Sequence, residues 1–280
     1  MSKHHKERWI NSGIYLAYVF VLLFFLFPIF WVLSLSLKSV QELFATPLIW
    51  FSTDPQFANY LHVFQNTNIV NYLYNSAKIV LLTVLFTLLV AIPAAYAFSR
   101  FNFKYKKISL FAVIMFQMIS PVVIAIPLYR FFVQVDLINT HASLILVYVA
   151  IQLPFSTWFL KGFFDTIPQA IDEAAIVDGC TRLQTLLKVI LPVSVPGIVS
   201  TSILVGVQSW SQFVIPFILL DNNELYPVSV GLVNLQSTID AITTHYLAAA
   251  SMLAILPVML VFILLQRFIV GALTSGAVKG

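Results

Sequence analysis

Residues 172–192, Asp-Glu-Ala-Ala-Ile-Val-Asp-Gly-Cys-Thr-Arg-Leu-Gln-Thr-Leu-Leu-Lys-Val-Ile-Leu-Pro, carry five charged side chains in a chain that has few. They overlap a loop, 161–188, between two long stretches without Asp, Glu, Lys or Arg, 137–160 and 189–220. A transmembrane helix needs about 20 consecutive apolar residues, and both stretches are longer than that. The segment is therefore predicted to be a loop at the membrane surface, between two membrane spans.

The composition of the whole chain also indicates a membrane protein. Of its 280 residues 60% are hydrophobic and 9% are charged, whereas a soluble domain has roughly 45–50% apolar and about 25% charged residues. The mean hydropathy is +0.94. A single cysteine, Cys180, permits no disulfide within the chain and no thiolate metal site.

Six uncharged stretches are long enough to span a bilayer: 9–37, 79–99, 108–129, 137–160, 189–220 and 241–266. They predict an all-α polytopic membrane protein with six transmembrane helices in one domain, 1–280. Nine of the 13 prolines lie in or beside these stretches, so we expect kinked helices. The fifth stretch is longer than one span requires, and we expect a break near 208–212.

The distribution of Lys and Arg predicts the orientation. With the segments 1–8 and 267–280 in the cytoplasm, 12 of the 15 basic residues lie inside and only Lys38, Lys78 and Arg130 lie outside. Basic residues are enriched in cytoplasmic loops of membrane proteins. The positive net charge of +4 therefore reflects topology, and it gives no reason to expect a nucleic-acid partner.

Several kinds of chemistry are missing from the sequence. The six stretches contain no ionisable Asp, Glu, Lys or Arg, which argues against a secondary carrier driven by protons or sodium. Residues 271–276 begin like a phosphate-binding loop, but Ala277 and Val278 stand where Lys and Ser or Thr are required. No histidine has metal-ligand spacing, and we find no cluster of catalytic groups for a membrane enzyme. If the chain takes part in driven transport, the energy must therefore come from another subunit.

Within the loop, the residues predict two short helices joined at a glycine. Pro168 suits the first turn of a helix, and Gly179 can adopt the positive φ that ends one. Beyond it an apolar stripe follows helical spacing, formed by Leu183, Leu186, Leu187 and Ile190. Such a unit could dock on a soluble partner or lie on the lipid headgroups, and spacing alone favours neither.

The loop resembles the EAA loop of ABC-importer permeases. Glu173-Ala174-Ala175, Gly179, Val189 and Leu191-Pro192 follow its order and spacing, with Val189 where isoleucine is usual and Cys180 where alanine is frequent. In that family the loop forms a coupling helix that sits in a cleft of the ATPase subunit. The resemblance implies that the ATPase-coupling residues are Asp172, Glu173, Ala174, Ala175, Asp178, Gly179, Val189, Leu191 and Pro192.

The resemblance extends over nearly the whole chain. Asn75-Ser76, Ala94 to Arg100, Pro127-Leu128-Tyr129 and Trp210-Ser211-Gln212-Phe213 are similar to carbohydrate permeases, although the family often has Asn and an acidic residue after the tryptophan. The ending, residues 274–280, looks like that of MalG-type subunits, where it reaches between the ATPases. It implies an ATPase-contacting tail at Gly276, Val278, Lys279 and Gly280.

This resemblance implies a type I ABC importer transmembrane domain (MetI-like), a transport subunit and not an enzyme. The expected partners are a second homologous permease, two cytoplasmic ABC ATPases that bind ATP and magnesium, an extracytoplasmic solute-binding protein and membrane lipid. The chain itself is expected to bind no cofactor and no metal. Its expected place is the cytoplasmic (inner) membrane of a bacterium or archaeon, with both termini cytoplasmic. The expected solute is a sugar, oligosaccharide or polyol; polyamine, phosphate and peptide permeases share the loop and stay as alternatives.

Uncharged polar residues within the stretches are candidates to line the solute pathway, because amides within a span need hydrogen-bonding partners. Hydrogen bonds between helices would satisfy the same side chains, and both interpretations stay open. The candidates are Gln117, Gln152, Gln208, Ser209, Trp210, Ser211 and Gln212.

Overall fold

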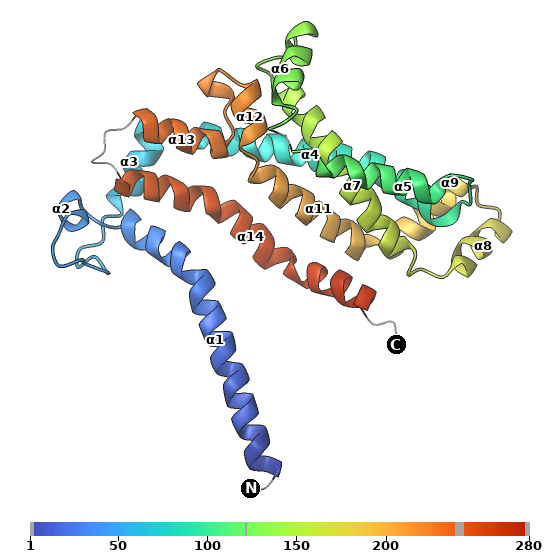
Figure 1. Ribbon diagram of the computed structural model, residues 1–280, viewed down its shortest axis with the longest axis horizontal. Helices are drawn as coiled ribbons and strands as arrows, with labels where there is room; N and C mark the ends of the chain where they lie inside the picture. Colours follow the sequence, from blue (N-terminus) through green and yellow to red (C-terminus); the bar gives the residue numbers. More distant parts are fainter. Residues whose placement is uncertain (1–2, 121, 239–243, 278–280) are drawn as a thin grey trace. The chain divides into compact units, whose positions relative to one another are not determined.

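The computed structural model describes residues 3–120, 122–238 and 244–277, and every regular element in these ranges is helical (Figure 1). The chain folds into two compact units, one of residues 1–69 and 232–255 and the other of residues 70–231 and 256–280. Within the described ranges the all-helical fold class is confirmed.

The first unit contains α1 (Lys3–Ser36), α2 (Val40–Leu43), α3 (Ala58–Asn66) and parts of α13 (Val228–Thr238) and α14 (Thr244–Ala277). Asn59 Nδ2 ties α3 to the end of α1, donating to the carbonyl oxygens of Ser36 at 2.9 Å and Lys38 at 3.1 Å. Ser39 and Glu42 form a capping box at the start of α2. The Glu42 carboxylate accepts a hydrogen bond from the Ser39 N–H, and this bond lowers the pKa of the Glu42 carboxyl below its ordinary value.

The second unit holds most of the other helices, and its elements follow in chain order. They are α4 (Ile69–Arg100), α5 (Lys106–Met115), η1 (Phe116–Met118), α6 (Ala125–Gln134), α7 (His141–Phe164), α8 (Gln169–Val177), α9 (Arg182–Thr185), the π-helical turn η2 (Leu186–Ile190), α10 (Leu191–Val193), α11 (Val195–Trp210), α12 (Val214–Leu219) and η3 (Asn223–Leu225).

Four helices of the described ranges are long and apolar enough to cross a membrane: 13–36 of α1, α4, α7 and 244–267 of α14. A fifth candidate is a bent pair, Arg182–Val193 and Val195–Trp210. The stretch 108–129, predicted as a span, contains α5, η1 and the start of α6 and is not one helix. Ser120 precedes Pro121, a position that disfavours the helical backbone. Six spans therefore stay a prediction.

The fifth uncharged stretch is interrupted twice. α11 ends at Trp210 and α12 begins at Val214, which confirms the break predicted near 208–212. The second interruption is a bend of 80° at Ser194, one of the proline kinks expected from the sequence, although its position was not predicted. Pro192 and Pro196 lie on either side of it and cannot donate helical hydrogen bonds, which explains why the helix bends there.

α7 packs against α5, α11 and α12 within the second unit (Figure 1). Two apolar clusters lie along it. The α12 cluster includes Ile79, Leu144, Tyr148, Ile215 and Leu219. The η2 cluster includes Ala91, Ala95, Leu160, Phe164 and Ile190. Residues of α4 and α7 belong to both clusters. These two helices therefore form the packed framework from which the loop after α7 extends.

Polar side chains at the start of α4 hold the segment before α13. Asn75 Nδ2 donates to the carbonyl oxygens of Glu224 at 2.7 Å and Tyr226 at 3.1 Å. Ser76 Oγ accepts the Val228 N–H at 2.8 Å. These bonds satisfy backbone groups of the segment, so the segment is held on α4.

Close packing of α11 on α7 provides a test of the fold. A Cβ at Gly197 would lie 2.5 Å from the Phe163 ring, whereas one at Gly206, also on α11, would meet Val80 at an ordinary 3.7 Å. Gly197→Ala should lower stability by about 1–3 kcal/mol because overpacking displaces the ring. Gly206→Ala should leave it unchanged or slightly higher. Thermal unfolding in detergent measures both, and equal melting temperatures for the two variants would contradict this packing.

Candidate functional site at the loop between α7 and α11

The loop begins where α7 ends at Phe164, and its first helix is α8. Pro168 precedes α8 with φ −56° and ψ 134°, a φ that the proline ring favours. The helix predicted to begin near Pro168 is thus present, with Pro168 as the residue before its first turn.

α8 ends at Val177 and is closed by Gly179, two residues further on, whose φ is +87°. The Cys180 N–H donates to the Ala175 carbonyl at 3.0 Å, and the Gly179 N–H donates to the Ile176 carbonyl at 3.0 Å. This pair of bonds is the Schellman motif, in which a left-handed residue closes a helix. The helix end predicted at Gly179 is confirmed.

A second short helix follows at once. Thr181 Oγ1 accepts the Gln184 N–H at 3.3 Å, and Gln184 Oε1 accepts the Thr181 N–H at 2.9 Å. This capping box starts α9. The wider π turn η2, which contains Val189, comes next, and Leu191 and Pro192 open α10. Two helices joined at a glycine are therefore observed, as predicted.

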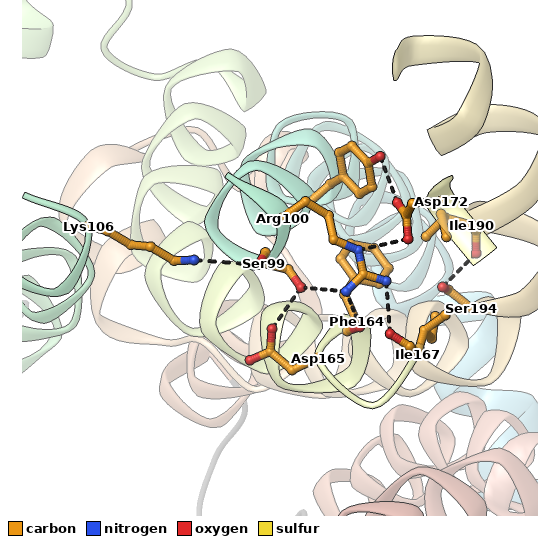
Figure 2. Close-up of polar contacts among 10 residues, drawn as sticks. Ser99, Arg100, Lys106, Phe164, Asp165, Ile167, Asp172, Ile190 and Ser194 are labelled. Carbon is orange, nitrogen blue, oxygen red and sulfur yellow. Dashed lines mark hydrogen bonds and ion pairs between the residues drawn. The ribbon is translucent and has the colours of Figure 1, made fainter. Parts of the chain in front are cut away.

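Asp172 faces into the protein. Its Oδ2 accepts a hydrogen bond from Arg100 Nε at 3.0 Å, and the two side chains are 4% and 5% exposed. Its Oδ1 accepts the hydroxyl of Tyr96 at 2.8 Å. Tyr96 and Arg100 both come from the end of α4, and Figure 2 shows Arg100 bonded to the Asp172 carboxylate. The ion pair therefore joins the first turn of α8 to the end of α4.

Arg100 also binds the end of α7. Nη1 donates to the Phe164 carbonyl at 3.1 Å, and Nη2 donates to the Ile167 carbonyl at 3.0 Å (Figure 2). Carbonyl groups at a helix end lack helical partners and attract positive charge. One guanidinium group thus satisfies the C-terminus of α7 and the carboxylate of α8 together.

The neighbouring charges are more exposed. Ser99 Oγ donates to Asp165 Oδ1 at 2.7 Å, and Lys161 Nζ lies 2.5 Å from Asp165 Oδ2. The Lys161 and Asp165 side chains are 19% and 42% exposed. Exposed pairs of this kind contribute little stability, so the Arg100–Asp172 pair is the stronger link.

The other face of α8 is open. Glu173, Ala174, Asp178 and Gly179 are exposed, and Val177 is 87% exposed. The two adjacent acids Asp172 and Glu173 therefore differ in role: one holds the helix, and the other is available to a partner.

A groove of about 420 Å³ runs beside this face. Its lining residues come from α8, from the turn after it and from η2: Ala170, Ile171, Ala174, Ala175, Asp178, Cys180 and Val189. Most of the residues assigned to coupling from the sequence thus lie together, on the open face of α8 or along this groove.

The candidate pathway residues do not gather at one place. Gln117, at η1, is exposed, and its Nε2 donates to the Ile151 carbonyl at 3.4 Å. Gln152 is 2% exposed on α7. Within the described ranges its Oε1 has no hydrogen-bond partner, and the same holds for the buried hydroxyls of Thr83, Thr87 and Ser156.

The other pathway candidates lie at the end of α11. Gln208 and Ser211 are exposed, and Ser211 Oγ donates to the Gln208 carbonyl at 3.2 Å. Ser209 is buried, and the Gln212 carbonyl accepts Ser229 Oγ at 2.6 Å. Trp210 lines a cavity of about 380 Å³ with mostly apolar residues of α4, α11 and α14. An apolar lining offers a sugar few hydrogen bonds.

Among the tail residues, Gly276 lies in the last turn of α14. Val278, Lys279 and Gly280 lie outside the described residues.

Arg100 and Tyr96 are not among the site residues predicted from the sequence, where Arg100 serves only for the orientation and as part of a motif similar to carbohydrate permeases. A signal was present, because Arg100 directly follows 21 uncharged residues, 79–99. An arginine at that place borders the membrane and needs a partner, since its desolvated charge is costly.

Removal of the Asp172 charge tests whether the Arg100–Asp172 ion pair anchors α8. Asp172→Asn leaves the buried Arg100 guanidinium without its counter-ion and should destabilise the protein by about 3 kcal/mol or more. Lys161→Gln, which breaks the exposed pair with Asp165, should change stability by less than about 1 kcal/mol. Thermal unfolding of the purified membrane protein compares them. A loss for Asp172→Asn no greater than that for Lys161→Gln would show that the buried pair does not hold α8.

Comparison with known proteins identifies the family. Residues 87–275 match the family described as binding-protein-dependent transport system inner membrane component. The chain is 34% identical over 255 residues to the sulfoquinovosyl glycerol transport system permease protein SmoH of Agrobacterium fabrum, a match that covers 91% of this chain and 89% of the relative. It is 32% identical to the trehalose/maltose transport system permease protein MalG of Thermococcus litoralis, which covers 91% of this chain and 92% of the relative.

A solved structure has the same fold. A chain of a bacterial ABC transporter involved in the import of the acidic polysaccharide alginate superposes with a TM-score of 0.78 at 20% identity, over 95% of this chain and 98% of that one. The family match covers well over half of the present chain, including α8 and its anchor. The chain therefore belongs to the binding-protein-dependent transport system inner membrane components, and it is a multi-pass inner-membrane permease subunit of an ABC transporter, a transport subunit and not an enzyme.

Proposed function

We propose that this chain forms half of the translocation pathway of an ATP-driven importer for a sugar, oligosaccharide or polyol, and that α8 couples it to a separate ATPase. The observation that carries the proposal is the two-sided character of α8. Asp172 is buried against Arg100, whereas Glu173, Val177 and Asp178 are exposed beside an apolar groove. A helix held from behind with an open apolar and acidic face suits docking on a soluble protein.

The proposed complex contains this chain, a second homologous permease, two cytoplasmic ATPases that bind ATP and magnesium, and an extracytoplasmic binding protein. The 18-residue window of α1 with the highest hydropathy has no buried residue. A helix that is apolar all round needs lipid or another protein around it, which supports assembly with a second permease. We also propose six spans with 108–129 as the third, and both termini in the cytoplasm.

The carbohydrate class rests on the relatives. The matched permeases are named for the transport of sulfoquinovosyl glycerol, diacetylchitobiose, trehalose/maltose and galactooligosaccharides. Their shared feature is a solute built from sugar units. The uncharged spans suit the neutral members of this class, since a buried charge facing a neutral sugar would be left unpaired.

Coupling follows from linkage between ATP and the conformation of the permease. ATP favours one state of the bundle only by binding the ATPases more tightly when the bundle is in that state. The route for this preference is contact between the ATPase and the open face of α8. Movement of α8 then changes which side of the membrane the pathway opens to.

Reversal of charge on the open face tests the coupling role. Glu173→Lys should leave membrane insertion and stability unchanged, because Glu173 is exposed, but it should reduce solute transported per ATP by about fivefold or more, the usual size of coupling between sites. Asp54→Lys, a matched reversal at an exposed residue between α2 and α3, should keep the normal ratio. Uptake and ATPase rates of the reconstituted complex give this ratio, and normal coupling in Glu173→Lys would overturn the assignment.

The solute class is tested with the complete complex and its binding protein in proteoliposomes. We expect at least one carbohydrate or polyol to stimulate ATP hydrolysis through the binding protein. A panel of mono-, di- and oligosaccharides, polyols, polyamines, phosphate and peptides separates the alternatives. Stimulation by a polyamine, phosphate or peptide, with none by any carbohydrate or polyol, would replace the carbohydrate assignment.

A further inference from the structure

We infer that Arg100 is a positioning residue that joins α8, the end of α7 and the end of α4 into one rigid body. Movement of α8 therefore enters the helix bundle through α4. This inference rests on the proposed coupling function of α8 and adds the part of the bundle to which α8 transmits its movement.

The guanidinium group of Arg100 bonds to three acceptors on two segments, α8 and the end of α7. Nε binds the Asp172 carboxylate at 3.0 Å, Nη1 the Phe164 carbonyl at 3.1 Å and Nη2 the Ile167 carbonyl at 3.0 Å. The fork is planar and stiff, so the three acceptors hold fixed positions around it (Figure 2). A lysine ammonium group is a single point charge and does not hold three acceptors in this arrangement.

The Arg100–Asp172 pair is also buried. The side chains of Arg100 and Asp172 are 5% and 4% exposed, so water is not at hand to replace their mutual hydrogen bond. The Tyr96 hydroxyl bonds to the second carboxylate oxygen at 2.8 Å. Separation of α8 from α4 would leave two buried charges and a hydroxyl without partners, which is strongly unfavourable. The joint therefore resists both sliding and separation.

The other end of α8, which leads to α11, has no comparable rigid connection among the described residues. Gly179 has φ +87°, and no atom of a neighbouring group lies within 4 Å of a Cβ built on it. Beyond it come the π turn η2 and the bend of 80° at Ser194. Glycine turns and π turns are common places for helices to bend. The path from α8 to α11 thus contains three interruptions, whereas the path from α8 to α4 is a direct ion pair.

Apolar contacts also link α8 to the bundle, because Ile171 packs on the η2 cluster. Such contacts are non-directional, so they permit rotation and sliding that an oriented ion pair does not. A movement of α8 is therefore transmitted to α4 through Arg100. Without its fork, α8 still docks on the ATPase, but its movement is lost before it reaches α4.

The experiment uses the complete complex in proteoliposomes with Arg100→Gln and Arg100→Lys. The first readout is solute transported per ATP. It should fall by about fivefold or more in Arg100→Gln, while ATP hydrolysis continues. Arg100→Lys keeps the charge opposite Asp172 but loses the fork, and its ratio should lie between those of Arg100→Gln and the unchanged protein. Lys161→Gln is the matched control, since it breaks only the exposed pair with Asp165, and it should couple normally.

The second readout measures rigidity directly. Spin labels at Gln169 on α8 and Val90 on α4, both exposed, report the distance between the two helices in a Cys180→Ser background. We expect the same narrow distance distribution with and without ATP in the otherwise unchanged complex, and a broad one in Arg100→Gln. A distance that changes with ATP when Arg100 is present would overturn the rigid-body inference.

The outcomes separate this inference from the proposed function. If Glu173→Lys uncouples transport but both Arg100 variants couple normally, α8 is the coupling helix and the inference about Arg100 is wrong. If Glu173→Lys couples normally, the proposed function fails independently of Arg100. Should Arg100→Gln fail to assemble, Arg100→Lys decides: normal coupling with a narrow distance distribution contradicts the inference, and reduced coupling with a broad one supports it.

Discussion

The loop that carries the candidate site depends on one buried ion pair, between Arg100 and Asp172. Only 9% of the chain is charged, and this pair is nine-tenths or more buried on both sides. A buried pair is favourable only where further hydrogen bonds satisfy its remaining atoms. Tyr96 and the carbonyl groups of Phe164 and Ile167 supply those bonds. The position of α8 thus follows from the need of two buried charges to be fully bonded.

Much of the local structure could be predicted from the sequence, because it depends on local chemistry. Gly179 ends α8, and the helix begins beside Pro168; each follows from the backbone preferences of a single residue. The break near 208–212 followed from the length of an uncharged stretch. The interruption within 108–129 and the position of the bend at Ser194 were not predicted, although prolines flank both, because a proline inside a membrane helix can either kink it or end it. Neighbouring helices decide between the two outcomes.

The anchor itself could not be predicted, because its partners lie 72 residues apart in the chain. Asp172, Glu173 and Asp178 looked like one acidic group in the sequence. Neighbours in a helix point about 100° apart, and Asp172 shares its face with the buried Ala175, while Glu173 shares its face with the exposed Val177. That periodicity divides the acids into an inner and an outer set. It does not identify Arg100 as the partner, since that requires the packing of α4 beside α7.

In the coupling role proposed for α8, this division of the acids would let a chain with few charges respond to an ATPase on another chain. An exposed carboxylate can gain or lose a partner at little cost, because water solvates it in either state. A buried carboxylate that loses its partner costs several kcal/mol, so in the inferred rigid body Asp172 keeps Arg100 while α8 moves. On this short helix the exposed Glu173 can therefore form a contact that changes, whereas the buried Asp172 forms a fixed joint to Arg100. A coupling helix needs both contacts. If it only docked on the ATPase, it would move without the helix bundle, and if it were only attached to the bundle, it would not respond to the ATPase.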